Sequence, residues 1–145
     1  MTHRITKRVA FSTLVLVLGL SGSAFAQKAR MDDYHRSLSK KMEAMVASGQ
    51  SCKVNINDSS DGQGVDAEIR LTMGIREFES FAPIAALEAA ALPHKFPAVY
   101  IYVRHEGTGR VGRIAFRDAE PLAATYNAGE REKAIEDMKS AIIWH

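Results

Sequence analysis

Residues 98–117, AVYIYVRHEGTGRVGRIAFR, decide the fold because two strand-like runs flank a glycine-rich turn. Apolar and polar residues alternate on both sides of the turn, as they do in strands that bury one face. A two-residue turn and a four-residue loop give the same register, with Glu106 opposite Gly109. We therefore predict an antiparallel hairpin with strands at 98–105 and 110–117.

The predicted register gives the hairpin two chemically different faces. The apolar face, which we expect to be the core face, pairs Val99 with Phe116, Ile101 with Ile114, and Val103 with Gly112. The outward face carries two tyrosines and three arginines: Tyr100, Tyr102, Arg104, Arg113 and Arg117. A solvated face on which arginine stacks over tyrosine is one interpretation. A partner-binding surface is the other, because tyrosine and arginine are enriched in binding hot spots.

The rest of the chain predicts helices around two hairpins. Three segments have apolar residues at three- and four-residue spacing: 28–48, 76–92 and 130–144. Residues 52–57 and 65–73 alternate in polarity and predict a first hairpin around a polar loop. The order helix–strand–strand–helix–strand–strand–helix predicts a two-layer α+β domain. We expect an antiparallel sheet of about four strands, covered mainly on one face by the three helices.

The N-terminal segment has the features of a cleaved secretory signal peptide. Three basic residues begin it: Arg4, Lys7 and Arg8. The apolar stretch Val9–Leu20 follows, and Ala24–Ala26 offers the small residues that a signal peptidase accepts. A retained anchor is the alternative, but the apolar run is shorter than the ~20 residues of a spanning helix. We expect cleavage of 1–26 and a single bacterial periplasmic domain at 27–145, with secretion to the medium as the alternative.

The charge balance and the glycines argue against nucleic acid and nucleotide cofactors. The 145 residues include 19 Lys+Arg and 17 Asp+Glu. Without the expected leader, acidic residues slightly outnumber basic ones, so the basic pI does not indicate a nucleic-acid partner. Gly107–Gly112 matches G-x-G-x-x-G, but a strand follows it where a nucleotide site requires a helix. We expect no cofactor.

The loop after the first alternating segment begins like a calcium-binding loop. Oxygen-bearing residues stand at the first, third, fifth and twelfth positions, with glycine at the sixth: Asn57, Ser59, Asp61, Glu68 and Gly62. The flanks read as strands rather than helices, so a plain hairpin loop is the preferred interpretation. Weak calcium binding is the alternative.

The single cysteine and the scattered histidines offer little chemistry. Cys52 alternates with Val54 and Ile56, which predicts a buried, inert thiol on the core face. An intermolecular disulfide and a nucleophile are the alternatives. The histidines beyond the leader lie far apart and lack metal-ligand spacing: His35, His94, His105 and His145. No metal site and no catalytic residues are assigned.

These patterns favour a binding protein over an enzyme. We predict a periplasmic accessory factor, of the inhibitor, immunity-type or chaperone-like kind, that binds another cell-envelope protein through the Tyr/Arg face. The sequence permits a homodimer but does not indicate one. The alternatives are a small periplasmic enzyme whose site is assembled only in the fold, and a weak calcium-binding structural module.

Overall fold

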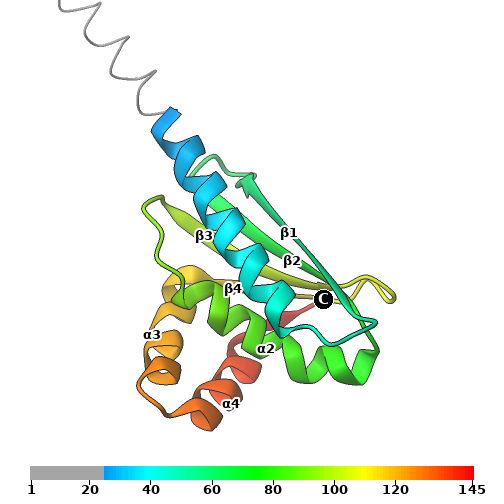
Figure 1. Ribbon diagram of the computed structural model, residues 1–145. Helices are drawn as coiled ribbons and strands as arrows, with labels where there is room; N and C mark the ends of the chain where they lie inside the picture. The colour runs from blue at the N-terminus through cyan, green and yellow to red at the C-terminus, as the bar shows by residue number, and fades with distance from the viewer. Residues whose placement is uncertain (1–24) are drawn as a thin grey trace, which may run out of the picture.

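The computed structural model describes residues 25–145, and it has α+β architecture (Figure 1). A helix described over residues 25–45, here called the N-terminal helix, comes first. The elements after it are β1 (Ser51–Asp58), β2 (Val65–Thr72), α2 (Ile75–Ala91), β3 (Ala98–His105), β4 (Val111–Ala115), α3 (Phe116–Asn127), α4 (Arg131–Ala141) and β5 (Ile143–Trp144). Among the described residues, no helix is both long and apolar enough to cross a membrane.

The sheet is mixed, with the strand order β1-β2-β3-β4-β5. The two predicted hairpins are confirmed, because β1 pairs antiparallel with β2 and β3 with β4. The prediction of an all-antiparallel sheet of about four strands is wrong, because β2 and β3 run parallel. The connection between β2 and β3 contains the 17-residue helix α2, and such a crossover returns the chain in the same direction.

The register of the second hairpin is confirmed over the whole of β4. Tyr102 lies opposite Arg113 and Ile101 opposite Ile114, as the turn geometry requires. The pairs expected beyond Ala115 do not form, because Phe116 begins α3. The buried residues of α3 recur at three- and four-residue spacing: Phe116, Ala119, Ala123 and Tyr126. This helix was not predicted, because the alternating pattern of β4 continues into its first residues.

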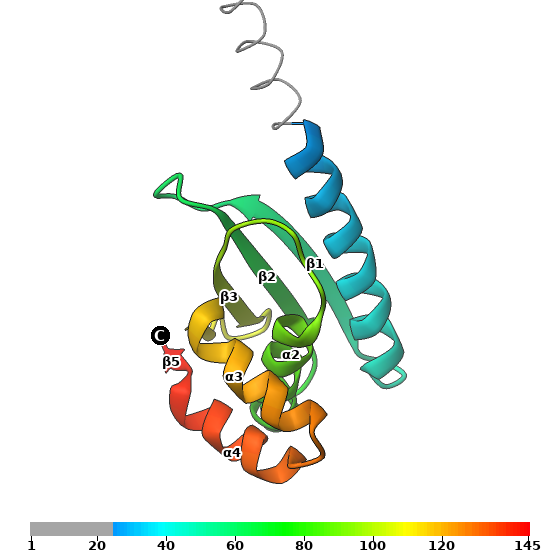
Figure 2. The same cartoon turned by 90° about the vertical axis from the view of Figure 1, so that its left-hand side faces the viewer.

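The helices cover one face of the sheet and leave the other open. Figure 2 shows α2 and α3 in front of the strands, α4 packed against these two helices below the strands, and the N-terminal helix beside β1. The side chains of Ile69, Leu71, Ile101 and Val103 on the covered face are at most 1% exposed. From Ala82 onward α2 is almost entirely buried, because other helices pack around it. Its many alanines leave room for this close packing.

The C-terminal segment corrects the prediction of a helix reaching Trp144. The helix α4 ends at Ala141, and β5 pairs with β4, with Trp144 opposite Gly112. A Cβ at Gly112 would lie 2.6 Å from the Ile142 side chain and 2.8 Å from that of Trp144. Glycine is therefore required where these two side chains pack over β4.

Candidate functional site

The candidate site is the sheet face that the helices leave uncovered, here called the open face. Directly paired residues on neighbouring strands lie on the same face, so the register defines its members. They form three rows across the strands. The cationic row is Lys53, Arg70 and Arg104, with Val111 at its β4 end. The middle row is Asn55, Glu68, Tyr102, Arg113 and Ile143. The aromatic–acidic row is Asn57, Asp66 and Tyr100, with Ala115 at its β4 end.

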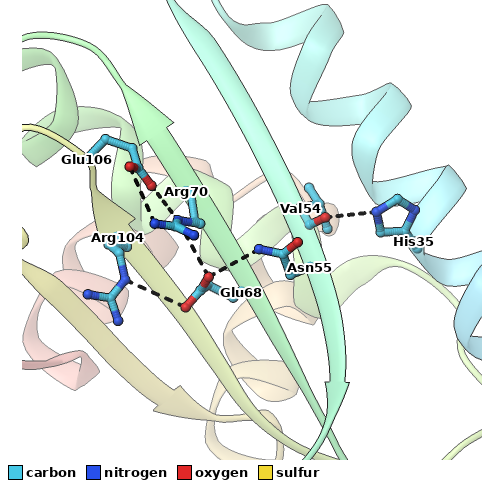
Figure 3. A network of polar contacts seen from close by, with 7 residues as sticks. All are labelled: His35, Val54, Asn55, Glu68, Arg70, Arg104 and Glu106. Carbon is cyan, nitrogen blue, oxygen red and sulfur yellow. Dashed lines mark hydrogen bonds and ion pairs between the residues drawn. The ribbon is translucent and has the colours of Figure 1, made fainter.

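The two arginines of the cationic row are held together by carboxylates on either side of them (Figure 3). Like charges directly opposite one another on neighbouring strands repel. Glu68 compensates from the middle row, with carboxylate oxygens 3.7 Å from Arg70 Nε and 3.6 Å from Arg104 Nε. On the other side, Arg70 donates hydrogen bonds to Glu106. Asn55 Nδ2 also donates to Glu68, at 3.3 Å. The network fixes the side chains without covering them.

The predicted stacking of arginine over tyrosine is present. The guanidinium of Arg113 lies 4.8 Å from the Tyr100 ring centroid, within the range of a cation–π contact. The rings of Tyr100 and Tyr102 are 6.0 Å apart. Burial raises the pKa of the Tyr102 hydroxyl; the nearby Asp66 carboxylate adds to this, and Arg113 opposes it. The tyrosines and Arg113 therefore form one packed cluster.

Two polar atoms, one in this cluster and one beside it, have no hydrogen-bond partner within the described residues. They are Asp66 Oδ1, an acceptor, and Arg113 Nε, a donor, and both atoms are buried. Burial raises the pKa of the Asp66 carboxyl, although the backbone N–H of Tyr100 opposes the shift by hydrogen bonding. Each unmet buried group carries a desolvation cost of about 1–3 kcal/mol.

Arg117 does not belong to the open face, which corrects the prediction that grouped it with Arg113. It lies on α3, its side chain is 88% exposed, and its Nε is 4.0 Å from Asp118. The cause is the early end of β4 at Ala115, which removes the expected pairing of Ala98 with Arg117. The other four predicted residues, Tyr100, Tyr102, Arg104 and Arg113, do share one face.

The calcium-loop residues are only partly brought together. Ser59 Oγ donates to Asp61 Oδ1 at 2.6 Å, and the Gln63 N–H donates to the same oxygen at 2.9 Å. The Ser59 hydrogen bond is the main reason why the pKa of Asp61 is lowered. Asn57 lies in the aromatic–acidic row, and Glu68 contacts arginines instead. Within residues 25–145, no three His, Cys, Asp or Glu side chains gather as metal ligands would.

Cys52 lies on the core-face side of β1 but is half-buried, where we expected a buried thiol. Burial, with a smaller contribution from Glu43, raises the pKa of the thiol to about 11. A thiol with this pKa is almost entirely protonated at neutral pH, which disfavours reaction as a nucleophile.

The sequence interpretation missed Glu88, the most buried carboxylate of the helical layer. Glu88 is 8% exposed, and its Oε2 lies 2.7 Å from Lys41 Nζ of the N-terminal helix. The Tyr126 hydroxyl of α3 donates to Glu88 Oε1 at 3.1 Å. A lone charge within the apolar run 85–91 was the available signal. Because its oxygens are paired, this group links three helices and does not form a reactive site.

His105 was also missed as a structural residue of the second turn. Its side chain is buried, and Nε2 donates to the Met73 carbonyl at 2.6 Å. The Thr108 N–H donates to Nδ1 at 3.1 Å, so Nδ1 is the acceptor of the neutral ring. Both ring nitrogens are therefore engaged in holding the β3–β4 turn against the end of β2.

No protein-family model, no curated protein and no solved structure matches this chain.

Proposed function

We propose that this protein is an exported binding protein that engages another protein of the cell envelope through its open face. The observation that carries the proposal is the packed Tyr100–Tyr102–Arg113 cluster, which lies on a sheet face that none of the described helices covers. Tyrosine and arginine supply much of the energy of protein interfaces.

Preorganisation of the open face supports the same function. Arg70 and Arg104 are already positioned by Glu68 and Glu106, so a partner would not have to order these long side chains. Ordering such side chains on association costs about 0.5–1.5 kcal/mol each. A hollow of about 380 Å³ lies at one end of the face, and neither tyrosine of the cluster lines it. The cluster suits a broad protein surface better than a small substrate.

Export is the second part of the proposal. Residues 1–24, which include most of the expected signal peptide, lie outside the described residues. Cleavage before Gln27 would keep the buried contacts of the N-terminal helix, which involve Tyr34, Leu38 and Met42. Intact-mass analysis of protein recovered from a periplasmic extract should show a chain that begins at Gln27. A product that retains Arg4–Leu20 would contradict export with cleavage.

Photo-crosslinking in the producing cells tests the binding surface. A benzophenone amino acid in place of Tyr102 should give covalent adducts with a cell-envelope protein when the cells are irradiated. The matched control carries the same amino acid in place of Asp137, which is exposed on α4. The proposal fails if the Tyr102 position gives no adduct beyond those of the Asp137 position.

A further inference from the structure

The open face is self-complementary about its middle row. Its cationic row lies on one side of the middle row, and its aromatic–acidic row lies on the other. On β2 the two outer rows carry Arg70 and Asp66, and on β3 they carry Arg104 and Tyr100. Each strand therefore presents a cation at one end and, at the other, a group that attracts cations.

We propose that the open face binds a second copy of this chain, face to face, about a two-fold axis that runs along the middle row. This inference goes beyond the proposed function, because it places a second copy of the chain, rather than a different envelope protein, on the same open face. The axis reverses the strand direction and sets the cationic row of one copy over the aromatic–acidic row of the other. Arg70 then faces Asp66 of the second copy, and Arg104 faces Tyr100.

The middle row supplies the apolar contact of this pairing. Residues on the axis meet their own equivalents, so Tyr102 packs against Tyr102 and Ile143 against Ile143. Arg113 also meets its equivalent, which brings one contact between like charges. Ile143 is 53% exposed, and it is one of three large apolar side chains exposed within residues 25–145. Glu68 also meets its equivalent, but the two arginines of its own chain already surround its carboxylate. Its charge therefore adds little repulsion.

The other simple two-fold arrangement is electrostatically worse. An axis parallel to the strands, between β2 and β3, would set β2 of one copy over β3 of the other. Arg70 of each copy would then face Arg104 of the other, which makes two contacts between arginines where the middle-row axis makes one, and Asp66 would face Tyr100 without a cation. Like charges brought together in an interface cost several kcal/mol. The axis along the middle row is therefore preferred.

The size of the open face sets the expected strength of the dimer. Three strands of eight residues and one of five, at about 3.3 Å per residue and about 4.8 Å apart, present roughly 460 Å² per copy. Two copies would bury about 900 Å², which is in the range of weak, transient interfaces. We therefore expect a reversible dimer, populated at high protein concentration and weakened by salt, because ion pairs contribute to it.

Sedimentation analysis of the chain from Gln27 tests the dimer directly. Mass should rise from monomer towards dimer with concentration, and Asp66→Asn should weaken the association about tenfold by removing both Arg70–Asp66 charge pairs. The same variant should be no less stable as a monomer, because burial opposes the Asp66 charge there. Asp137→Asn on α4 is the control and should associate like the parent. A monomer at all concentrations, or equal association of both variants, would overturn the inference.

Crosslinking locates the interface on the open face. In a Cys52→Ser background, Tyr102→Cys should be joined to its equivalent by a short bis-maleimide, whereas Glu136→Cys on α4 should not. A dimer joined equally well at both positions would place the contact elsewhere and overturn the inference. If the purified chain is monomeric while Tyr102 in cells crosslinks to a different envelope protein, the proposed function stands and the second-copy inference fails. If neither the dimer nor a crosslink to another envelope protein forms, the proposed function and the second-copy inference both fail.

Discussion

The two faces of one sheet use the same strands for different purposes. On β3, Ile101 and Val103 are at most 1% exposed beneath the helices, while Tyr100 and Tyr102 on the other side remain partly exposed. The covered face is stabilised by apolar burial, which is non-directional. The open face is organised by ion pairs and aromatic contacts, which depend on direction and fix side chains in place. Substitutions on the two faces should therefore affect different properties.

The largest expected effect is on the covered face. Ile101→Ala should lower the free energy of unfolding by roughly 2–5 kcal/mol, because the side chain is fully buried and its loss leaves a cavity. Urea unfolding monitored by circular dichroism measures this loss. Ile101→Val is the matched control and should cost only about 0.5–1.5 kcal/mol. A loss on Ile101→Ala no larger than that of the control would mean that the faces are assigned the wrong way round.

A smaller loss is expected within the helical layer, where polar contacts join the helices. Glu88→Gln should cost on the order of 1–3 kcal/mol, because the buried group loses its charged contact with Lys41. Lys41→Met tests the same contact from the exposed side. A double-mutant cycle by urea unfolding should show that the two changes are not additive. Additive losses would show that the contact between Lys41 and Glu88 does not stabilise the fold.

The open face should respond least in stability. Tyr102→Ala combined with Arg113→Ala should cost about 1 kcal/mol or less, because exposed cross-strand pairs contribute little. The melting temperature should change little, while the concentration-dependent association measured by sedimentation is lost. Severe unfolding of this variant would show that the cluster belongs to the core. Intact folding with undiminished association would show that the face is only solvated.

The smallest effect concerns the reactivity of Cys52 at the edge of the sheet. Folding raises the pKa of the Cys52 thiol to about 11 and so disfavours the thiolate. The free energy of unfolding therefore falls only as the pH rises from about 9 towards 11. At pH 8 the native thiol should therefore react with iodoacetamide more slowly than the thiol of the urea-unfolded chain. Equal rates would show that the folded environment does not suppress the thiolate.

The sequence predicted those features that depend on local pairing. The turn around Gly107 determined the β3–β4 register, and with it the shared face of Tyr102 and Arg113. Contacts distant in sequence determined the rest. The sequence pattern that leads to Phe116 suits a strand as well as a helix. In the structure Phe116 begins α3, and its ring is buried against His94 and the N-terminal helix. The parallel pairing of β2 with β3 likewise depends on how α2 crosses the sheet.

The site was predictable in composition but not in organisation. Four of the five predicted residues share the open face, because alternation and register fix which side of a strand each residue occupies. The neighbours from the first hairpin were missed, since Glu68 and Asp66 reach β3 only through the parallel pairing. The Glu68 carboxylate positions Arg70 and Arg104, and the Asp66 carboxylate has one oxygen without a hydrogen-bond partner among the described residues. The sequence of the second hairpin alone does not show these contacts with the first hairpin.

The N-terminal helix has a consequence for solubility. Among the described strands β1 pairs only with β2, so its other edge is free. His35 of the N-terminal helix donates from Nε2 to the Val54 carbonyl of β1 at 2.8 Å (Figure 3). An eight-residue edge strand without such a neighbour is a template for strand addition by other chains. The helix therefore protects the protein against aggregation, and a chain that lost it by proteolysis would expose an edge on which fibres can grow.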